Sequence, residues 1–209
     1  LIQVLRFFTD EKVANVLGKV NPQEEIEIVQ TELLFADLEH LERLEEKFHS
    51  RAKAGDKEAK ENVSQLEVIK GHLEKGLPLR LMNLSRSVSL NYFLTTKPII
   101  YLANLAEKDL EGPPSFWKGV ESYVIEKEKS KLFPLCVKLE EEIAGLPPEE
   151  REKFREELGE RSEYLENLIW GAYYLLDLVS FFTVVGTEVR AWTVPRGTNA
   201  LKAAGKVHT

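Results

Sequence analysis

Residues 99–107 read IIYLANLAE, and this stretch decides the fold. An apolar run opens directly after Lys97-Pro98 and stops at Asn104, and Glu107 follows three positions later. Such a run is typical of a strand buried on both faces of a parallel sheet. The carboxyl end of such a strand is where open α/β sheets bind ligands. An amide and a carboxylate at that point therefore suggest a site that reads the edge of a purine base, although a loop turn and a surface charge are the commoner explanation of such a pair taken alone.

The composition is that of a globular protein of one or two domains. Of the 209 residues, 43% are hydrophobic and 30% are charged, which is enough apolar material for a core. The net charge of -7 argues against electrostatic binding of nucleic acid by the chain as a whole, but leaves open a local basic face within 190–206. The single cysteine, Cys136, cannot form an internal disulfide, which fits a reducing compartment.

The ends and the longest apolar stretches bear on the location of the protein. Every long apolar stretch is broken by Asp, Gly or Tyr before it reaches bilayer length, so we expect no transmembrane helix. We see no charged-then-apolar leader, and expect a cytoplasmic protein without a secretory signal. Residues 1–8, LIQVLRFF, already read as a buried strand, and residues 206–209 stop in the middle of a pattern. We therefore expect this chain to be a piece of a longer protein.

Two amphipathic helices are predicted between the first strand and the decisive stretch. Residues 10–22 read as a polar connection that ends in the turn signal Asn21-Pro22. From Glu24 apolar residues recur every three or four positions until Ala54-Gly55-Asp56 breaks the pattern. A second such run follows and ends near 76–78. Two long helices joined by a short turn predict an antiparallel helical hairpin with solvated, charged outer faces.

The remaining elements follow the decisive strand. A helix over 115–129 and a buried strand over 132–137 complete a βαβ unit, hence a parallel pair with a right-handed crossover. A charged helix starts at Pro147-Pro148, and a more apolar helix covers 164–179. Residues 181–194 read as a β-hairpin, and 199–204 as a short helix. The segment 79–96 is ambiguous between a loop and a short helix.

Six motifs together resemble one family, the YchF or Obg-like ATPases, which are P-loop NTPases. The motifs cover nearly the whole chain, and the NxxE box with the closing block is the most specific part. They read VxRxFxD at 4–10, VxGxxNP at 16–22, IEIxxxEL at 26–33, LTxKPxxYxxNxxE at 94–107, FTxxGxEVRAWT at 182–193 and RGTxAxxAAGxVHT at 196–209.

The resemblance implies an α/β fold in three parts. Residues 1–23 and 95–180 would form part of the nucleotide-binding domain with its parallel sheet, 24–94 an inserted coiled-coil-like hairpin, and 181–209 the start of a β-grasp TGS domain. The phosphate-binding loop GxxxxGK[ST], the magnesium-binding threonine and the DxxG segment are absent and would precede Leu1. The resemblance thus implies ATP and Mg²⁺ for the full-length protein, whereas this segment alone is predicted to be inactive and to contain no catalytic residue.

The same resemblance assigns the base-reading residues. Related GTPases use an NKxD box whose Asp accepts hydrogen bonds from guanine. Here Glu107 stands in place of that Asp, and Leu105 in place of the Lys that lies along the ring. The longer carboxylate weakens the guanine clamp, so the family resemblance implies a preference for ATP over GTP, with Asn104 pairing with the purine edge and Leu105 packing against the ring.

A second loop would touch the base mainly through its backbone. Cys136, Val137 and Lys138 stand where the family often has Ser-Ala-Lys. Without the family, Cys136 is a small buried hydrophobe rather than a redox group. The unclustered histidines His40, His49 and His72 are not at metal-ligand spacing, and we predict no metal site in this chain.

Three other positions of the motifs have less defined roles. The family usually has His at the position of Asn15 and Asp at that of Asn21. Both flank the base of the hairpin, where the change could alter how the insertion is braced. His208 belongs to a motif for which turn structure and ligand contact are equally good explanations.

We predict ATP hydrolysis by a P-loop mechanism in the full-length protein, used as a switch on the ribosome or another translation component. RNA is a candidate partner; DNA and membranes are not. The competing hypothesis is a non-catalytic adaptor that binds protein or RNA through the helical hairpin and the TGS module. An upstream Gly-Lys-Ser/Thr loop would decide for the enzyme.

Overall fold

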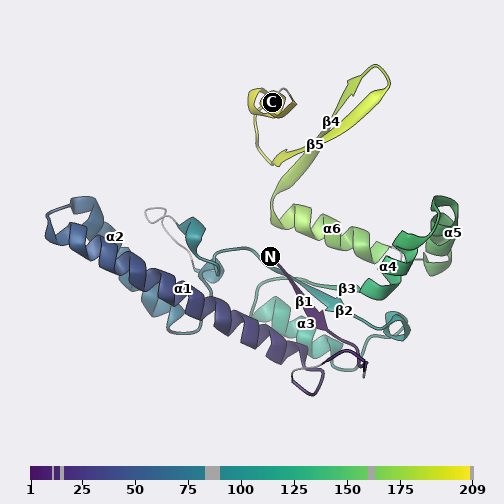
Figure 1. Ribbon diagram of the computed structural model, residues 1–209, viewed down its shortest axis with the longest axis horizontal. Helices are drawn as coiled ribbons and strands as arrows, with labels where there is room; N and C mark the ends of the chain where they lie inside the picture. Colours follow the sequence, from purple (N-terminus) through teal and green to yellow (C-terminus); the bar gives the residue numbers. More distant parts are fainter. Residues whose placement is uncertain (11, 15–16, 83–89, 160–162, 208–209) are drawn as a thin grey trace. The chain divides into compact units, whose positions relative to one another are not determined.

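The computed structural model describes residues 1–10, 12–14, 17–82, 90–159 and 163–207. The roles considered for Asn15 and His208 lie outside these residues. Two compact units, Leu1–Leu132 and Phe133–Thr209, divide the chain (Figure 1), and each is described by itself. The division into a nucleotide domain, an inserted hairpin and a TGS segment stays a prediction.

A parallel sheet organises the first unit. Strand β1 (Ile2–Arg6) pairs with β2 (Ile100–Asn104) in a register that runs from Ile2 opposite Ile100 to Arg6 opposite Asn104. The strand order is β1-β2-β3, which puts β2 in the centre; β3 (Leu132–Leu135) begins at the boundary of the units. Helix α3 (Trp117–Glu126) lies between β2 and β3 in the chain. The predicted α/β fold with a parallel sheet is confirmed.

The two paired strands differ in burial. In β2 the run from Ile100 to Ala103 is buried throughout, as expected for a central strand. In β1 Leu5 is fully buried, but Ile2 and Val4 are 51% and 56% exposed. The prediction of a wholly buried first strand is therefore wrong at these two positions. The reason is that alternate side chains point to opposite faces, so Ile2 and Val4 share a face that is left exposed at these positions, while Leu5 points to the buried face.

The hairpin consists of α1 (Pro22–Lys53) and α2 (Lys57–Leu73), which lie side by side (Figure 1). Their apolar stripes pack into one buried cluster together with Phe93. The buried members of this cluster from the hairpin and the segment after it are Leu34, Leu41, Leu66, Ile69, Leu73 and Leu79. The predicted helical hairpin is confirmed, since the three- and four-residue spacing places these side chains on the facing sides of the helices.

Caps set the ends of both helices. Helix α1 begins at Pro22, two residues before the predicted start at Glu24, because Asn21 is its N-cap. The Asn21 side chain accepts the Glu24 N–H at 3.4 Å and donates to Glu24 Oε2 at 2.8 Å. Asp56 caps α2 by accepting the Ala59 N–H at 3.1 Å. That hydrogen bond, together with the nearby Arg51, lowers the pKa of Asp56. The short break between the helices is thus a built turn.

A buried carboxylate ties the hairpin to the segment before β2. Asp37 of α1 is 1% exposed and accepts the backbone N–H groups of Leu94 at 2.6 Å and Thr95 at 2.8 Å. The Thr95 hydroxyl also donates to Asp37, at 2.6 Å, and in turn accepts the N–H of Leu79 at 3.1 Å. The ambiguous segment contains the short 3₁₀ turns η1 (Leu79–Leu81) and η2 (Leu90–Tyr92), with 83–89 outside the described residues.

A second buried carboxylate ties the same region to the sheet. Glu128, just after α3, is 4% exposed and forms an ion pair with Arg80. Tyr101 of β2 donates its hydroxyl to Glu128 at 2.9 Å, and Arg80 also donates to Gln30 of α1 at 3.1 Å. Burial and the neighbouring Glu128 raise the pKa of Tyr101 well above its usual value, so the phenol stays protonated as a donor. We call Arg80, Glu128, Tyr101 and Gln30 the buried brace.

The second unit holds helices and an antiparallel hairpin. Helices α4 (Val137–Gly145), α5 (Pro148–Leu158) and α6 (Tyr164–Leu175) precede β4 (Leu178–Val185) and β5 (Glu188–Pro195), and α7 (Ala200–Val207) follows. The strands pair from Leu178 opposite Pro195 to Val185 opposite Glu188. Gly186 makes the turn with a φ of 62°, in the left-handed region. Helix α6 ends at Leu175, four residues before the end at 179 that the sequence predicted. The helix cannot continue to 179 because Asp177 adopts a φ of 50°, which is not helical.

Removal of Arg80 should destabilise the protein far more than removal of an exposed arginine. Arg80→Met leaves Glu128 buried without its cation, which should cost about 3–5 kcal/mol of unfolding free energy. Tyr101→Phe deletes only one hydrogen bond and should cost about 1 kcal/mol. Arg43→Met is the control, because its pair with Glu39 is exposed and should contribute less than about 1 kcal/mol. Urea denaturation of the full-length variants would contradict this account if Arg80→Met and Arg43→Met lose equal stability.

A methyl group at Gly171 should clash in the second unit. A Cβ at this position would lie 2.3 Å from the Phe133 ring, so Gly171→Ala should destabilise by about 1–3 kcal/mol. Gly119→Ala in α3 is the matched control, since its added Cβ would meet no atom within 4 Å and alanine favours the helix by about 1 kcal/mol. The midpoint temperature of thermal unfolding should fall for Gly171→Ala and rise for Gly119→Ala. A Gly171→Ala protein as stable as the wild type would show that the Phe133 ring can move aside.

Candidate functional site

The candidate site begins at the carboxyl end of the central strand. Asn104 is the last residue of β2, opposite Arg6 of β1, and its carbonyl accepts the Phe7 N–H at 3.0 Å. The backbone ladder therefore continues to the end of the strand and fixes the position of Asn104. Phe7 itself is buried and lies against Phe116 and Trp117, with ring centroids 5.4 and 5.5 Å away.

After Asn104 the chain turns into the short helix η3 (Glu107–Leu110). The Asp109 N–H donates to the Ala106 carbonyl at 3.0 Å, and the buried Leu110 anchors the far end of the turn. Glu107, the first residue of η3, is exposed. The turn thus brings an amide and a solvated carboxylate to one end of the central strand, which is the arrangement that the sequence analysis used.

Leu105 has a different environment from its two polar neighbours. It is 3% exposed, so its side chain already packs inside the protein. This burial gives Leu105 a structural role in holding the strand end. Its contact with a base ring stays a prediction.

Arg6 organises the loop beside the strand end, a role that the sequence analysis did not assign. Its guanidinium donates to four backbone carbonyls at 2.9–3.1 Å and lies over the Phe8 ring, with Cζ 4.7 Å from the centroid. The carbonyls belong to Phe8, Asp10, Val13 and Ala14. The only signal in the sequence was the place of Arg6 in the VxRxFxD motif, because an arginine that binds carbonyls leaves no pattern of hydropathy.

The second predicted loop lies in the other unit. Cys136 is 5% exposed and precedes α4 at the N-cap position, where its carbonyl accepts the Glu140 N–H at 3.1 Å. Its burial agrees with the interpretation as a small hydrophobe. Val137 and Lys138 open α4 and are exposed, and Lys138 Nζ lies 3.9 Å from Glu142 Oε1. The roles of these three residues toward a base remain predictions.

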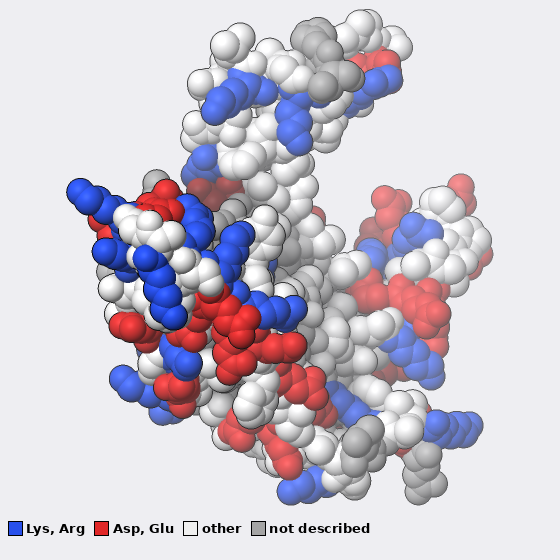
Figure 2. Space-filling model, turned by 60° about the vertical axis from the view of Figure 1, so that its left-hand side comes forward, with Lys and Arg blue, Asp and Glu red and all other residues white. Residues whose placement is uncertain are grey.

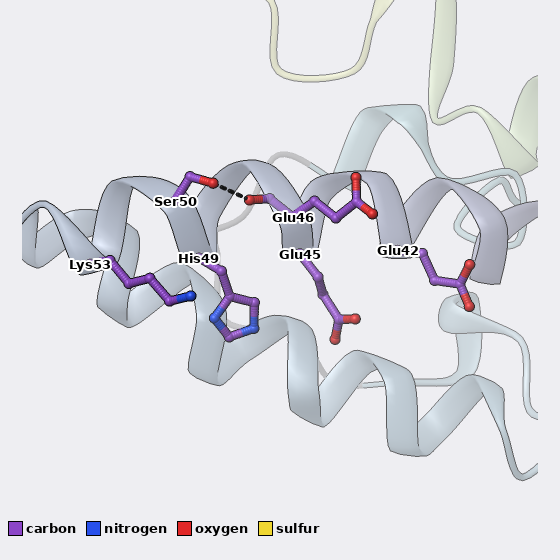
Figure 3. Close-up of a pocket in the computed structure, with 6 residues that line it drawn as sticks. All are labelled: Glu42, Glu45, Glu46, His49, Ser50 and Lys53. Carbon is purple, nitrogen blue, oxygen red and sulfur yellow. Dashed lines mark hydrogen bonds between the residues drawn. The ribbon is translucent and has the colours of Figure 1, made fainter.

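A hollow along α1 is lined only by polar or charged side chains (Figure 3). These are Glu42, Glu45, Glu46, His49, Ser50 and Lys53. Glu45 pairs with Lys70 of α2 at 3.2 Å, and Ser50 donates to the Glu46 carbonyl at 3.0 Å. Among the described residues, no group of three or more His, Cys, Asp or Glu side chains could hold a metal ion. The helices that are described also include none long and apolar enough to cross a membrane.

Comparisons with known proteins agree on one family. The model of the family YchF-GTPase_C, "Protein of unknown function (DUF933)", matches residues 178–209. "Ribosome-binding ATPase YchF" of Escherichia coli O157:H7 is 41% identical over 210 residues, covering 99% of this chain and 57% of that protein. The protein of the same name from Bacillus subtilis (strain 168) is 34% identical over 215 residues, with 100% and 58% coverage.

A solved structure is similar over the same part. "Structure of the Schizosaccharomyces pombe YchF GTPase" matches with a TM-score of 0.84 and 31% identity, covering 99% of this chain and 58% of that chain. The chain thus spans a little more than half the length of the relatives it matches.

Truncations at two neighbouring positions should separate the site from the core. Glu107→Ala removes an exposed side chain and should change unfolding free energy by no more than about 0.5 kcal/mol while weakening nucleotide binding. Leu105→Ala empties a buried position and should cost about 2–5 kcal/mol of stability. Both are measurable on the full-length protein by urea denaturation and by binding of a fluorescent ATP analogue. Unchanged binding in Glu107→Ala would remove this residue from the site.

Proposed function

Because the chain belongs to the YchF family, we propose that the full-length protein binds and hydrolyses ATP in preference to GTP and acts as a switch on the ribosome. The observation that carries the proposal is the placement of Asn104 and the exposed Glu107 at the carboxyl end of the central strand β2. Open parallel sheets bind their ligands at this end. The relatives named ribosome-binding ATPases support the partner.

The chemistry of the purine edge explains the base preference. Guanine offers two donors, N1–H and the exocyclic amine, which one short carboxylate can accept together. The Glu107 carboxylate stands one methylene further from the backbone than an Asp would, which displaces both acceptors. Adenine offers a donor and an acceptor on the same edge, and the Asn104 amide can supply the complementary pair. Loss of one charge-assisted hydrogen bond costs about 1.5–3 kcal/mol, enough for a preference of tenfold or more.

A role of the second loop toward the nucleotide would depend mainly on its backbone. Residues Cys136 to Lys138 lie at the start of α4, where helix N–H groups point outward and favour polar ligand atoms. Lys138 is exposed and its neighbour Glu142 is 3.9 Å away at the surface, so its charge is available to a ligand at little cost. In this proposal the three residues touch the base or ribose and take no part in hydrolysis.

Hydrolysis itself would depend on groups outside the described residues. The GxxxxGK[ST] loop does not occur in this sequence, and the described residues hold no acidic cluster fit for a metal ion. We therefore place the phosphate-binding loop and the Mg²⁺ ligands elsewhere in the full-length protein. When bound there, Mg²⁺ would neutralise charge on the phosphates, while this segment holds the base. A full-length sequence without that loop would favour a non-catalytic adaptor instead.

Shortening the carboxylate should move the base preference. In the full-length protein, Glu107→Asp should lower the ratio of ATP to GTP affinity at least fivefold, because the acceptors return to the guanine N1–H and amine. Competitive binding and turnover with both nucleotides would measure it. Glu111→Asp is the matched control, an exposed carboxylate in the next turn of the chain that should leave the ratio unchanged. If Glu107→Asp and Glu111→Asp behave alike, this account of the box is wrong.

A further inference from the structure

The charge of the helical hairpin changes sign along its length. Residues 22–46, the larger part of α1, contain nine acidic residues and one arginine, a net charge of -8. Residues 47–60, the end of α1, the turn and the start of α2, contain five basic and two acidic residues, a net charge of +3. We call residues 47–60 the hairpin tip. Figure 3 shows the change on one side of α1, from Glu42 and Glu45 to Lys53.

Four lysines give the tip its free positive charge. Lys47, Lys53, Lys57 and Lys60 are all exposed, and none of them lies within 4.0 Å of a carboxylate oxygen among the described residues. Arg51, in contrast, is held by Asp56, with its Nη2 2.7 Å from Oδ2. Figure 2, in which the hairpin end is turned forward, shows several Lys and Arg side chains there, with Asp and Glu side chains beside them.

Helix stability does not account for these lysines. Lys53, the last residue of α1, suits the negative end of that helix dipole. Lys57, however, is the first residue of α2, and Lys60 is the fourth, where the dipole disfavours a positive charge. Their presence at the wrong helix end, without a carboxylate partner among the described residues, points to a partner outside the hairpin.

The chemistry of the tip selects a polyanion. Phe48, the large apolar side chain of residues 47–60, is partly buried against the hairpin cluster, which leaves neither an exposed anchor for a membrane nor an exposed aromatic hot spot for a protein interface. Ala54 and Gly55, in the turn between Lys53 and Lys57, have small side chains or none, so a backbone of phosphates can approach closely. Glu45 and Glu46, the nearest acidic residues of α1, border the tip within a Debye length, so the positive charge is confined to residues 47–60, whose net charge is +3.

We propose that the hairpin tip binds the phosphate backbone of RNA, through Lys47, Lys53, Lys57 and Lys60. Contacts of this kind carry no base sequence and depend strongly on salt. The acidic part of α1 would repel the same RNA, so the hairpin would engage it end-on, with only the tip in contact. The inference rests on the proposed ribosome association, whose RNA would be the natural target.

The test replaces the four lysines by glutamine in the full-length protein, which keeps helix propensity while removing the charges. Binding to a single-stranded 20-nucleotide RNA is measured by fluorescence anisotropy at KCl concentrations from 50 to 200 mM. At the lowest salt, the affinity of the variant for the RNA should be at least tenfold lower than that of the wild type. Each lost phosphate contact should reduce the slope of log affinity against log salt by roughly 0.7. The loss of all four lysine contacts should therefore reduce the slope by about 3. The control replaces Lys75, Lys118, Lys127 and Lys153, four exposed lysines outside the tip, and should leave binding within twofold.

Two separate measurements distinguish a failure of this inference from a failure of the proposed function. Co-sedimentation of the wild type with ribosomes tests the proposed partner, while the RNA titration tests the tip alone. Equal RNA affinity in the tip variant and the wild type would overturn the inference, even if the wild type binds ribosomes. Equal loss in the tip and control variants would also overturn it, since net charge would then be the cause. Loss of ribosome binding with RNA binding intact would assign the tip to a protein surface instead.

Discussion

The buried carboxylate of Glu128 constrains how the first unit is assembled. A carboxylate that is 4% exposed is costly unless a cation and hydrogen-bond donors meet it. Arg80 supplies the cation from the segment after α2, and Tyr101 supplies a hydroxyl from the middle of β2. These groups come from positions far apart in the chain, so they meet only when the hairpin, the central strand and the end of α3 are all in place.

The same strand carries both the buried brace and the candidate site. Tyr101 lies three residues before Asn104, and the strand between them is buried throughout. On the hairpin side, Asp37 holds Leu94 and Thr95, which lie a few residues before β2. The position of the proposed base-reading box is therefore set by polar contacts with the hairpin as well as by the sheet ladder, which is a physical link between the two parts.

The sequence predicted those features that depend on the periodicity of apolar residues. The two hairpin helices, the central strand and the β4-β5 hairpin follow from spacings and turn residues, and α1 was misplaced by two residues only because Asn21 caps it. The buried polar contacts were not predictable in this way, because a pattern reads Asp37 and Glu128 as solvated and cannot say which distant donors meet them. The apolar run predicted that the strand ends at Asn104, as β2 does, but the burial of Leu105 depends on the packing of the whole unit and leaves no such pattern.

The two signs of charge on the hairpin have different causes. Several acidic groups of α1 form contacts within the protein. Glu25 accepts the backbone N–H of Arg6 at 3.0 Å, Asp37 accepts hydrogen bonds from the segment before β2, and Glu45 pairs with Lys70. The lysines of the tip have no such carboxylate partners among the described residues. The acidic half is thus used in part to attach the hairpin to the sheet, which requires burial and fixed geometry. The basic half is exposed and carries charge that folding does not use, and charge of this kind is what a contact with an external polyanion requires.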